Sequence, residues 1–268
     1  MTRLSDSEID TYRSDGLVVP NFRLSQAKLD ILSQAVDDLV GANPDIPPEY
    51  LVGPHIPGHY VTGPDLHQIF LAICMDSEVL DMVEDLIGSD IILWSSGVFC
   101  KPATVGRTVP WHQDGKYWPI RPLATCSVWI AIDDALPDNG CMRYIPGSHS
   151  QRRLWRHELT EDDDQVLNQQ VASDQFDVND ARDDILHAGQ MSLHDVYLIH
   201  GSNANVSGRR RAGYVMRYIP GTSRYDREME VGQSSNIGVS DFKRRPIWLL
   251  RGVDRTDRND FGTGHQLA

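Results

Sequence analysis

The stretch Ile91-Ile92-Leu93-Trp94-Ser95-Ser96-Gly97-Val98-Phe99-Cys100-Lys101 is where the chain changes from helical to strand-like patterning. From here on, short runs rich in β-branched and aromatic residues alternate with turns, which is typical of strands. The later runs are Thr125 to Ile132, Met142 to Ile145, Met191 to Ile199 and Ala212 to Ile219. Many short strands after a helical segment predict a mainly β (α+β) protein. Its core would be a double-stranded β-helix, the jelly-roll or cupin-like fold, packed by N-terminal helices.

The residues before Ile91 carry helix signals. Ser5-Asp6-Ser7-Glu8 is a capping box that opens a helix ending at Gly16. A second helix is predicted up to Gly41, and a third from the N-cap Asp76 to Gly88. Their apolar positions recur at helical spacing: Leu29, Leu32, Val36, Leu39 and Val40 in the second, and Val79, Leu80, Val83, Leu86 and Ile87 in the third. We expect these helices to pack against the β core.

Length and composition favour one domain. The 268 residues fit one large β domain, and no stretch resembles a linker between two halves. We therefore predict a single domain over 1–268, with helical support and a lid loop in 1–90, the jelly-roll core in 91–220 and a C-terminal extension in 221–268. The sequence does not specify the oligomeric state.

Charge and hydropathy exclude some partners. The formal net charge of −13 argues against nucleic acid, because phosphate binding needs a basic surface. No run approaches the ~20 apolar residues of a membrane span. The start, Met1 to Asp6, has no apolar core of a secretory signal, so we expect a cytoplasmic protein. The four cysteines form no CxxC motif, and reduced buried thiols are expected: Cys74, Cys100, Cys126 and Cys141.

A candidate metal site begins at His112-Gln113-Asp114. On a strand, residues i and i+2 point to the same side, so His112 and Asp114 can converge on one ion while Gln113 faces away. His200, which ends the apolar run Val196 to Ile199 and precedes a turn, is the candidate third ligand. Two imidazoles and one carboxylate that leave other positions open are the ligand set of non-haem Fe(II) oxygenases.

Arg211 stands eleven residues after His200 and opens the apolar run Ala212 to Met216. We interpret the two runs as a hairpin, which would set a guanidinium near the metal, where it could pair with a carboxylate of a small co-substrate. Two alternatives stay open. A zinc hydrolase with the same ligands would leave Arg211 unexplained and needs a general base that we cannot place. A non-catalytic jelly-roll binding or sensor protein is the other.

The chain resembles the phytanoyl-CoA dioxygenase family of Fe(II)/2-oxoglutarate-dependent oxygenases, which includes ectoine hydroxylase. The matching segments are Trp111 to Asp114, Trp118 to Pro122, Asn139 to Cys141, Pro146 to His149, His200 to Ser202 and Arg209 to Arg211.

This resemblance implies that His112, Asp114 and His200 bind iron, and that Arg211, helped by Ser202, holds the far carboxylate of 2-oxoglutarate. Trp129 matches a family position that walls the co-substrate pocket, although a tryptophan in an apolar run is as often plain core. The implied reaction uses O₂ to hydroxylate an unactivated C–H bond of a small metabolite and releases succinate and CO₂.

Signals for the substrate are fewer. Residues 44–64 are rich in Pro and Gly and hold His55, His59 and Tyr60, and a loop of this length indicates an active-site lid. With the triad complete, the two histidines are not expected to bind metal. The candidate substrate-binding residues are Tyr60, Lys116, Tyr117, Trp118 and Arg217. Aromatic residues at the mouth could cage a cationic amine, and an arginine would suit a carboxylate, so we hypothesise a zwitterionic or amine metabolite. No basic patch for the phosphates of an acyl-CoA is evident.

Overall fold

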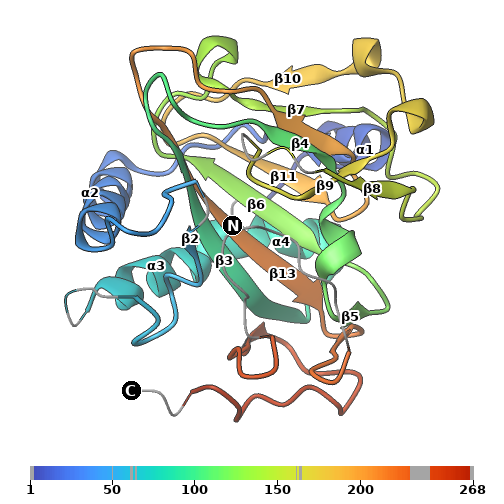
Figure 1. Cartoon of the computed structure of the whole chain (residues 1–268). Helices are drawn as coiled ribbons and strands as arrows, with labels where there is room; N and C mark the ends of the chain where they lie inside the picture. The colour runs from blue at the N-terminus through green and yellow to red at the C-terminus, as the bar shows by residue number, and fades with distance from the viewer. Residues whose placement is uncertain are drawn as a thin grey trace.

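Two antiparallel β-sheets lie face to face at the centre of the structure, a computed structural model (Figure 1). It describes residues 3–49, 51–60, 63, 65–160, 162, 165–229 and 242–265. The larger sheet runs in the order β1 (Leu17–Val18), β11 (Met191–Asp195), β6 (Cys126–Ala131), β13 (Arg211–Pro220), β3 (Ile91–Lys101) and β15 (Trp248–Arg251), and β2 (Leu51–Val52) also pairs with β3. The smaller sheet is β10 (Arg182–Asp184), β7 (Met142–Tyr144), β12 (His200–Ser202) and β4 (Val109–His112).

Two short strand pairs and several single-turn helices complete the β region. The pairs are β5 (Ile120–Arg121) with β14 (Arg224–Tyr225), and β8 (His157–Leu159) with β9 (Gln169–Val171). The 3-10 helices are η1 (Asp114–Tyr117), η2 (Pro137–Asn139), η3 (Ser173–Gln175) and η4 (Val178–Asp180). The two facing antiparallel sheets agree with the predicted mainly β, jelly-roll architecture.

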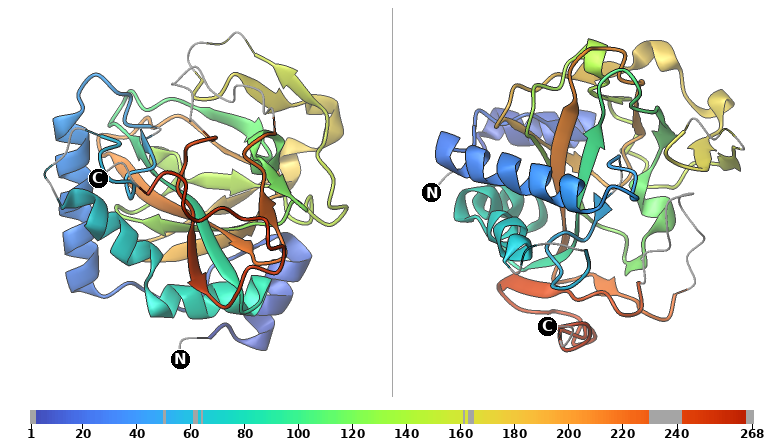
Figure 2. Two further views of the ribbon diagram at one scale, coloured as in Figure 1. Left: turned by 90° about the horizontal axis from the view of Figure 1, so that it is seen from below. Right: turned by 60° about the vertical axis from the view of Figure 1, so that its left-hand side comes forward.

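Four helices cover the outer face of the larger sheet: α1 (Asp6–Asp15), α2 (Gln26–Ala42), α3 (Leu66–Cys74) and α4 (Ser77–Ile87). In the right-hand view of Figure 2, the blue and cyan helices lie on one side of the central strands. The core between them includes the fully buried side chains Leu32, Val36, Phe70 and Val79. Each such side chain stabilises the fold by roughly 1.5–3 kcal/mol. No helix among the described residues is long and apolar enough to cross a membrane.

The helix signals of the sequence are confirmed at three of the four helices. Ser5 and Glu8 form the capping box of α1, which ends at Gly16 with φ 84°. The Asp76 side chain accepts a hydrogen bond from Glu78 N at the start of α4, and Gly88 ends that helix. The sequence reading missed α3. This helix is almost wholly apolar, so it shows no clear alternation of apolar and polar residues, and its N-cap residue, Asp65, makes no side-chain capping hydrogen bond.

The helices cover one face of the larger sheet, and the other face lines a pocket. On β13, Ala212, Tyr214, Met216 and Tyr218 pack into the core with the helices. Because side chains alternate along a strand, the residues between them, Arg211, Gly213, Val215 and Arg217, face the smaller sheet.

The predicted hairpin is wrong. β12 pairs with β4 and β7 in the smaller sheet, whereas β13 pairs with β3 and β6 in the larger one. The predicted strand Met191 to Ile199 also ends at Asp195, after which the chain turns and crosses to the other sheet. Val196, Leu198 and Ile199 are fully buried in this crossing. Their apolar character therefore reflects burial between elements, which a run of this length cannot distinguish from a strand.

The described part of the predicted lid packs on the larger sheet. Leu51 and Val52 form β2, which pairs with Val98 and Gly97 of β3. His55 is fully buried, and its Nδ1 shares a 2.6 Å hydrogen bond with Ser96 Oγ. His55 therefore packs in the interior of the protein. Within this loop, residues 50, 61, 62 and 64 lie outside the described part of the chain.

Candidate metal centre and its pocket

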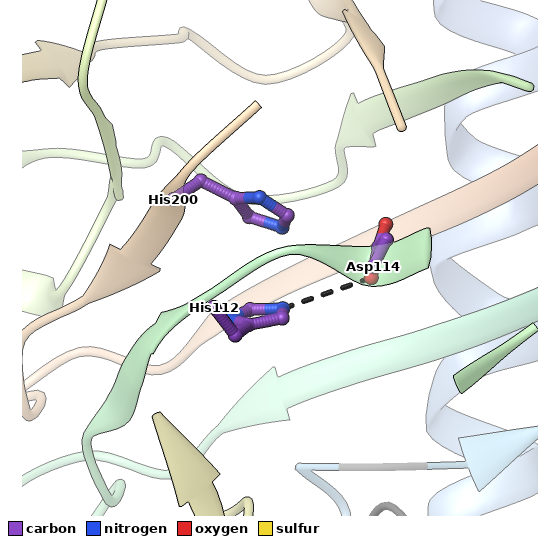
Figure 3. A group of neighbouring side chains, drawn as sticks. All are labelled: His112, Asp114 and His200. Carbon is purple, nitrogen blue, oxygen red and sulfur yellow. Dashed lines mark ion pairs between the residues drawn. The ribbon is translucent and has the colours of Figure 1, made fainter. Parts of the chain in front are cut away.

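The side chains of His112, Asp114 and His200 point toward one another from two neighbouring segments (Figure 3). His112 ends β4, Asp114 begins η1, and His200 begins β12 directly opposite His112. The two imidazole centroids are 4.2 Å apart, and His112 Nε2 lies 3.6 Å from Asp114 Oδ1. One ligand atom from each residue lies within 4.8 Å of the others, and all three residues are buried. This spacing suits a shared metal ion.

Gln113 explains why the two neighbouring ligands converge. Its backbone is extended, with φ −120° and ψ 125°, so His112 and Asp114 project to the same side although Asp114 already starts a 3-10 helix. The Gln113 side chain points away and is fixed by the backbone: its amide donates to Tyr197 O at 2.6 Å and Arg153 O at 3.0 Å, and its oxygen accepts from Trp155 N at 2.7 Å. The predicted alternation is confirmed.

Backbone carbonyls fix the tautomer of both histidines. His112 Nδ1 donates to Pro110 O at 2.9 Å, and His200 Nδ1 donates to Leu198 O at 3.0 Å. A carbonyl can only accept, so each Nδ1 carries the proton and each Nε2 keeps its lone pair for a metal. Burial, with the neighbouring His112, lowers the pKa of His200 to about 3, so the ring is neutral at neutral pH. The two imidazoles therefore fit a divalent metal.

The Asp114 carboxylate is kept ionised by its surroundings. Burial tends to raise its pKa, but the Arg217 guanidinium and the neighbouring rings of His112 and His194 outweigh burial and hold that pKa well below its usual value. Asp114 Oδ2 lies 3.8 Å from His194 Nε2 and 4.0 Å from Arg217 Nε, while Oδ1 faces His112. One oxygen is thus directed to the metal position and the other to its supporting residues.

His194 lies beside the metal ligands, and the sequence alone did not predict it. It lies on β11 and lines the same pocket, with its ring centroid 5.1 Å from that of His200. A single histidine inside an apolar strand gives no spacing signal. Only the cross-strand register, which brings β11 beside β6 and β13, identifies it.

Arg211 enters the pocket from the larger sheet. The pocket lies between the two sheets and is lined by residues of both, including the triad, Ser202, Arg211 and Trp129. Burial lowers the pKa of the Arg211 guanidinium to about 10, so it stays charged at neutral pH. Its Nε and Nη2 donate to Gly140 O at 3.1 and 2.8 Å, and no carboxylate of the described residues lies within ion-pair distance of it. A buried guanidinium that is hydrogen-bonded only on one side can accept an anionic ligand on the other.

Trp129 closes one side of this anchor. Its ring lies so near the backbone of Gly213 that a Cβ there would come within 1.9 Å of Trp129 Cζ2. The Arg211 guanidinium carbon is 5.4 Å from the centre of the Trp129 ring. The tryptophan is therefore a pocket wall and also part of the core.

The candidate substrate residues separate into two groups. Trp118 and Arg217 are buried and line the pocket. Lys116 is exposed, and Tyr60 donates its hydroxyl to Val52 O at 2.7 Å and is not among the described lining residues. The side chain of Tyr117 lies outside the described part of the chain. Other residues line the pocket although the sequence did not predict them, including Trp94, Ser95, Phe99 and Arg245.

Comparisons with known proteins identify the family of the chain. The family model of phytanoyl-CoA dioxygenase (PhyH) matches residues 12–213. Peroxisomal phytanoyl-CoA dioxygenase of Bos taurus is 27% identical over 195 residues, covering 67% of this chain and 58% of that protein. An ectoine dioxygenase of Sphingopyxis alaskensis is 22% identical over 267 residues, covering 92% of this chain and 83% of the relative. The chain spans only 49% to 58% of the lengths of the first three curated relatives.

Solved structures share the fold. The non-heme monooxygenase ThoJ superposes with a TM-score of 0.69 at 24% identity, covering 95% of this chain and 85% of the other. The non-heme alpha-ketoglutarate-dependent carbocyclase SnoK gives 0.67 at 20% identity, covering 89% and 95%. These structural matches confirm the predicted jelly-roll fold. The chain belongs to the phytanoyl-CoA dioxygenase family.

Proposed function

We propose that this chain is an Fe(II)- and 2-oxoglutarate-dependent dioxygenase that hydroxylates an unactivated C–H bond of a small metabolite, with release of succinate and CO₂. In this proposal His112, Asp114 and His200 hold the iron. Arg211, with the Ser202 hydroxyl, holds the far carboxylate of 2-oxoglutarate, and Trp129 shields it. The observation that carries the proposal is the meeting of two features in one pocket: two Nε2 lone pairs beside a carboxylate, and a buried guanidinium with donors to spare.

Iron, together with 2-oxoglutarate and O₂, would supply the oxidising chemistry when bound. The protein contributes orientation and shielding. The carbonyls of Pro110 and Leu198 fix the two imidazoles, and His194 and Arg217 fix the second oxygen of Asp114. Arg211 and Trp129 hold the co-substrate in one orientation, which removes much of the entropic cost of bringing the reactants together. The burial of these residues also keeps bulk water away from the reacting centre.

Membership of the family supports a small-molecule substrate but does not identify it. The bovine relative is named for phytanoyl-CoA and the Sphingopyxis relative for ectoine, so the family does not fix one substrate. A zwitterionic metabolite, as hypothesised from the sequence, is kept here as the finer proposal because its carboxylate could pair with an arginine of the pocket.

The test is succinate formation from 2-oxoglutarate under air with added Fe(II), without any prime substrate. Wild type should show slow turnover, His112→Ala should fall to the level of the iron-free protein, and Arg211→Ala should raise the KM for 2-oxoglutarate by about 10- to 100-fold. His187→Ala and Arg209→Ala are matched controls, since both residues are exposed. Turnover that survives His112→Ala, or a hydrolase activity that depends on zinc, would refute the proposal.

A further inference from the structure

The end of the pocket around Arg217 carries positive charge that the proposed co-substrate site does not use. We propose that Arg217 binds an anionic group of the prime substrate, a carboxylate or a phosphonate. This inference rests on the proposed function, because it assigns a substrate class to the same pocket.

Arg217 stands at the opposite end of the pocket from the co-substrate anchor. Arg211 and Arg217 lie on the same face of β13, six residues apart, which corresponds to about 20 Å between their Cα atoms. Gly213 and Val215 lie between them on this face. Since Arg211 is assigned to the far carboxylate of 2-oxoglutarate, the guanidinium of Arg217 is available to a second anionic group.

Unpaired polar atoms gather at this end. The strand register places Arg217 of β13 beside Ser127 of β6, and Ser127 beside His194 of β11. Arg217 Nε, Ser127 Oγ and His194 Nδ1 are buried and have no hydrogen-bond partner among the described residues. An unsatisfied buried polar atom destabilises a protein, so a row of them marks a place that a ligand or ordered water completes.

The charges of the pocket call for an anion. Asp114 is the one carboxylate among the described lining residues, and its Oδ2 is 4.0 Å from Arg217 Nε, at the limit of an ion pair. A divalent metal would share that carboxylate. With a divalent metal and the 2-oxoglutarate dianion bound, Asp114, Arg211 and Arg217 leave one positive charge in excess. An uncompensated buried charge is costly, and one anionic group on the substrate would neutralise it.

A second guanidinium lies on the same wall. Arg245 is buried, and its Nη1 donates to Ser95 Oγ at 3.0 Å. Ser95 is the cross-strand neighbour of Arg217 on β3, next to a register shift in the β13–β3 pair. Ser95, Arg217 and Arg245 all line the pocket. This end is therefore a donor-rich surface suited to an oxyanion.

The aromatic residues of the pocket do not offer a cage for an amine, because each already has a guanidinium of the protein over its ring. Arg217 lies 5.2 Å from the centre of the Trp118 ring and 5.7 Å from that of Phe99. Arg245 and Arg211 cover the remaining rings of the pocket, Trp94, Phe242 and Trp129. A cationic amine would meet these guanidiniums and be repelled. If the substrate is a zwitterion, its anionic end belongs at Arg217.

The experiment measures binding to the Fe(II)-loaded protein without oxygen, in saturating 2-oxoglutarate so that Arg211 is occupied. The probes are pentanoate, pentylphosphonate, methyl pentanoate and pentylamine, and the readout is isothermal titration calorimetry. We expect the two anions to bind and the ester and amine not to bind. In Arg217→Met the Kd of the anions should rise by about 10- to 100-fold, and the Kd of 2-oxoglutarate should rise by much less. The exposed Arg209→Met variant should match wild type.

Several results would overturn the inference: neither anion binds, the ester or amine binds as well as the acid, or Arg217→Met weakens 2-oxoglutarate as much as the anions. The wild-type panel decides this even if Arg217→Met does not fold, and Arg217→Lys, which keeps the charge, provides a second variant. The proposed function fails separately. If 2-oxoglutarate gives no binding heat while pentanoate does, the co-substrate assignment is wrong and the anion site stands.

Discussion

A small set of buried charged and polar residues determines the chemistry of the pocket. Two imidazoles keep their Nε2 lone pairs because carbonyls accept from Nδ1, and one aspartate stays ionised because an arginine and two histidines surround it. Arg211 and Arg217 supply positive charge at the two ends. At the scale of single residues, the site is therefore prepared for a divalent cation flanked by anions.

His194 should act on the metal through Asp114. Replacing it by alanine removes the ring that lies 3.8 Å from Asp114 Oδ2. We expect His194→Ala to weaken Fe(II) binding by about 10- to 100-fold, as is common for residues that orient a metal ligand. Competition with a coloured chelator measures this change. The exposed His187→Ala is the control. Unchanged iron affinity in a folded His194→Ala protein would show that His194 has no role in orienting the carboxylate.

Asp184 gives a prediction for the pH dependence of stability. Burial, only partly offset by a hydrogen bond from Ser192, raises its pKa to about 7. Between the usual aspartate pKa and 7, the folded carboxyl holds a proton that the unfolded one has lost, so the free energy of unfolding falls as the pH rises through this window. Asp184→Asn should therefore be more stable than wild type at pH 8, by on the order of 2–4 kcal/mol, with the difference vanishing toward pH 4.

Urea unfolding at the two pH values measures this difference. Asp183→Asn, at the exposed neighbouring position, should show no comparable pH-dependent gain. An Asp184→Asn variant that is no more stable than wild type at pH 8 would mean that the buried carboxyl is charged and well solvated.

Much of the residue-scale site could be predicted from sequence, and the reason is local. His112 and Asp114 are two residues apart on an extended segment, so their convergence follows from strand geometry. His200 and Arg211 were selected from the apolar runs beside them, and the family resemblance implied the same roles. His194, Ser95 and Arg245 could not be predicted, because their positions depend on which strands pair and in which register. Strand pairing and register cannot be derived from the local pattern of a single sequence.

Among the elements, β13 links the site to the core, because its two faces have different roles. One face packs against the helices, and the other carries Arg211, Gly213, Val215 and Arg217. Gly213 allows the close approach of Trp129. The strand connects the proposed co-substrate anchor, the aromatic wall and the proposed anion site.

Gly213→Ala tests this arrangement. A Cβ at position 213 would come within 1.9 Å of Trp129 Cζ2, so the ring must move. We expect a loss of about 1–3 kcal/mol in the free energy of unfolding and a higher KM for 2-oxoglutarate. Gly208→Ala is a matched control, since a Cβ there would meet nothing within 4 Å. Wild-type stability and KM in Gly213→Ala would show that Trp129 does not wall the co-substrate.

The elements with strong local signals were predicted well. The run Ile91 to Lys101 is β3 over its full length, and the capping residues of α1 and α4 are as expected. The errors fall where tertiary context decides. The apolar segment after Asp195 is a crossing between sheets, and α3 has an apolar sequence whose N-cap residue makes no side-chain hydrogen bond.

At the scale of the whole molecule, the pocket is formed between the two sheets, and both sheets contribute residues to it. The triad comes from the smaller sheet and the turn that follows β4, while Arg211, Arg217, Trp129 and His194 come from the larger sheet. Neither sheet alone holds a complete site. The double-layered fold, supported by helices on the outside, brings the triad and the two arginines into one pocket.

The central claim is that this pocket binds iron through the triad and 2-oxoglutarate through Arg211. The most direct test is the visible absorbance of the Fe(II)-loaded protein when 2-oxoglutarate is added without oxygen. We predict a saturable new band in wild type, no band in His112→Ala, and a band in Arg211→Ala that needs at least about 10-fold more 2-oxoglutarate. No band in iron-loaded wild type, or an equal band in His112→Ala, would contradict the assignment.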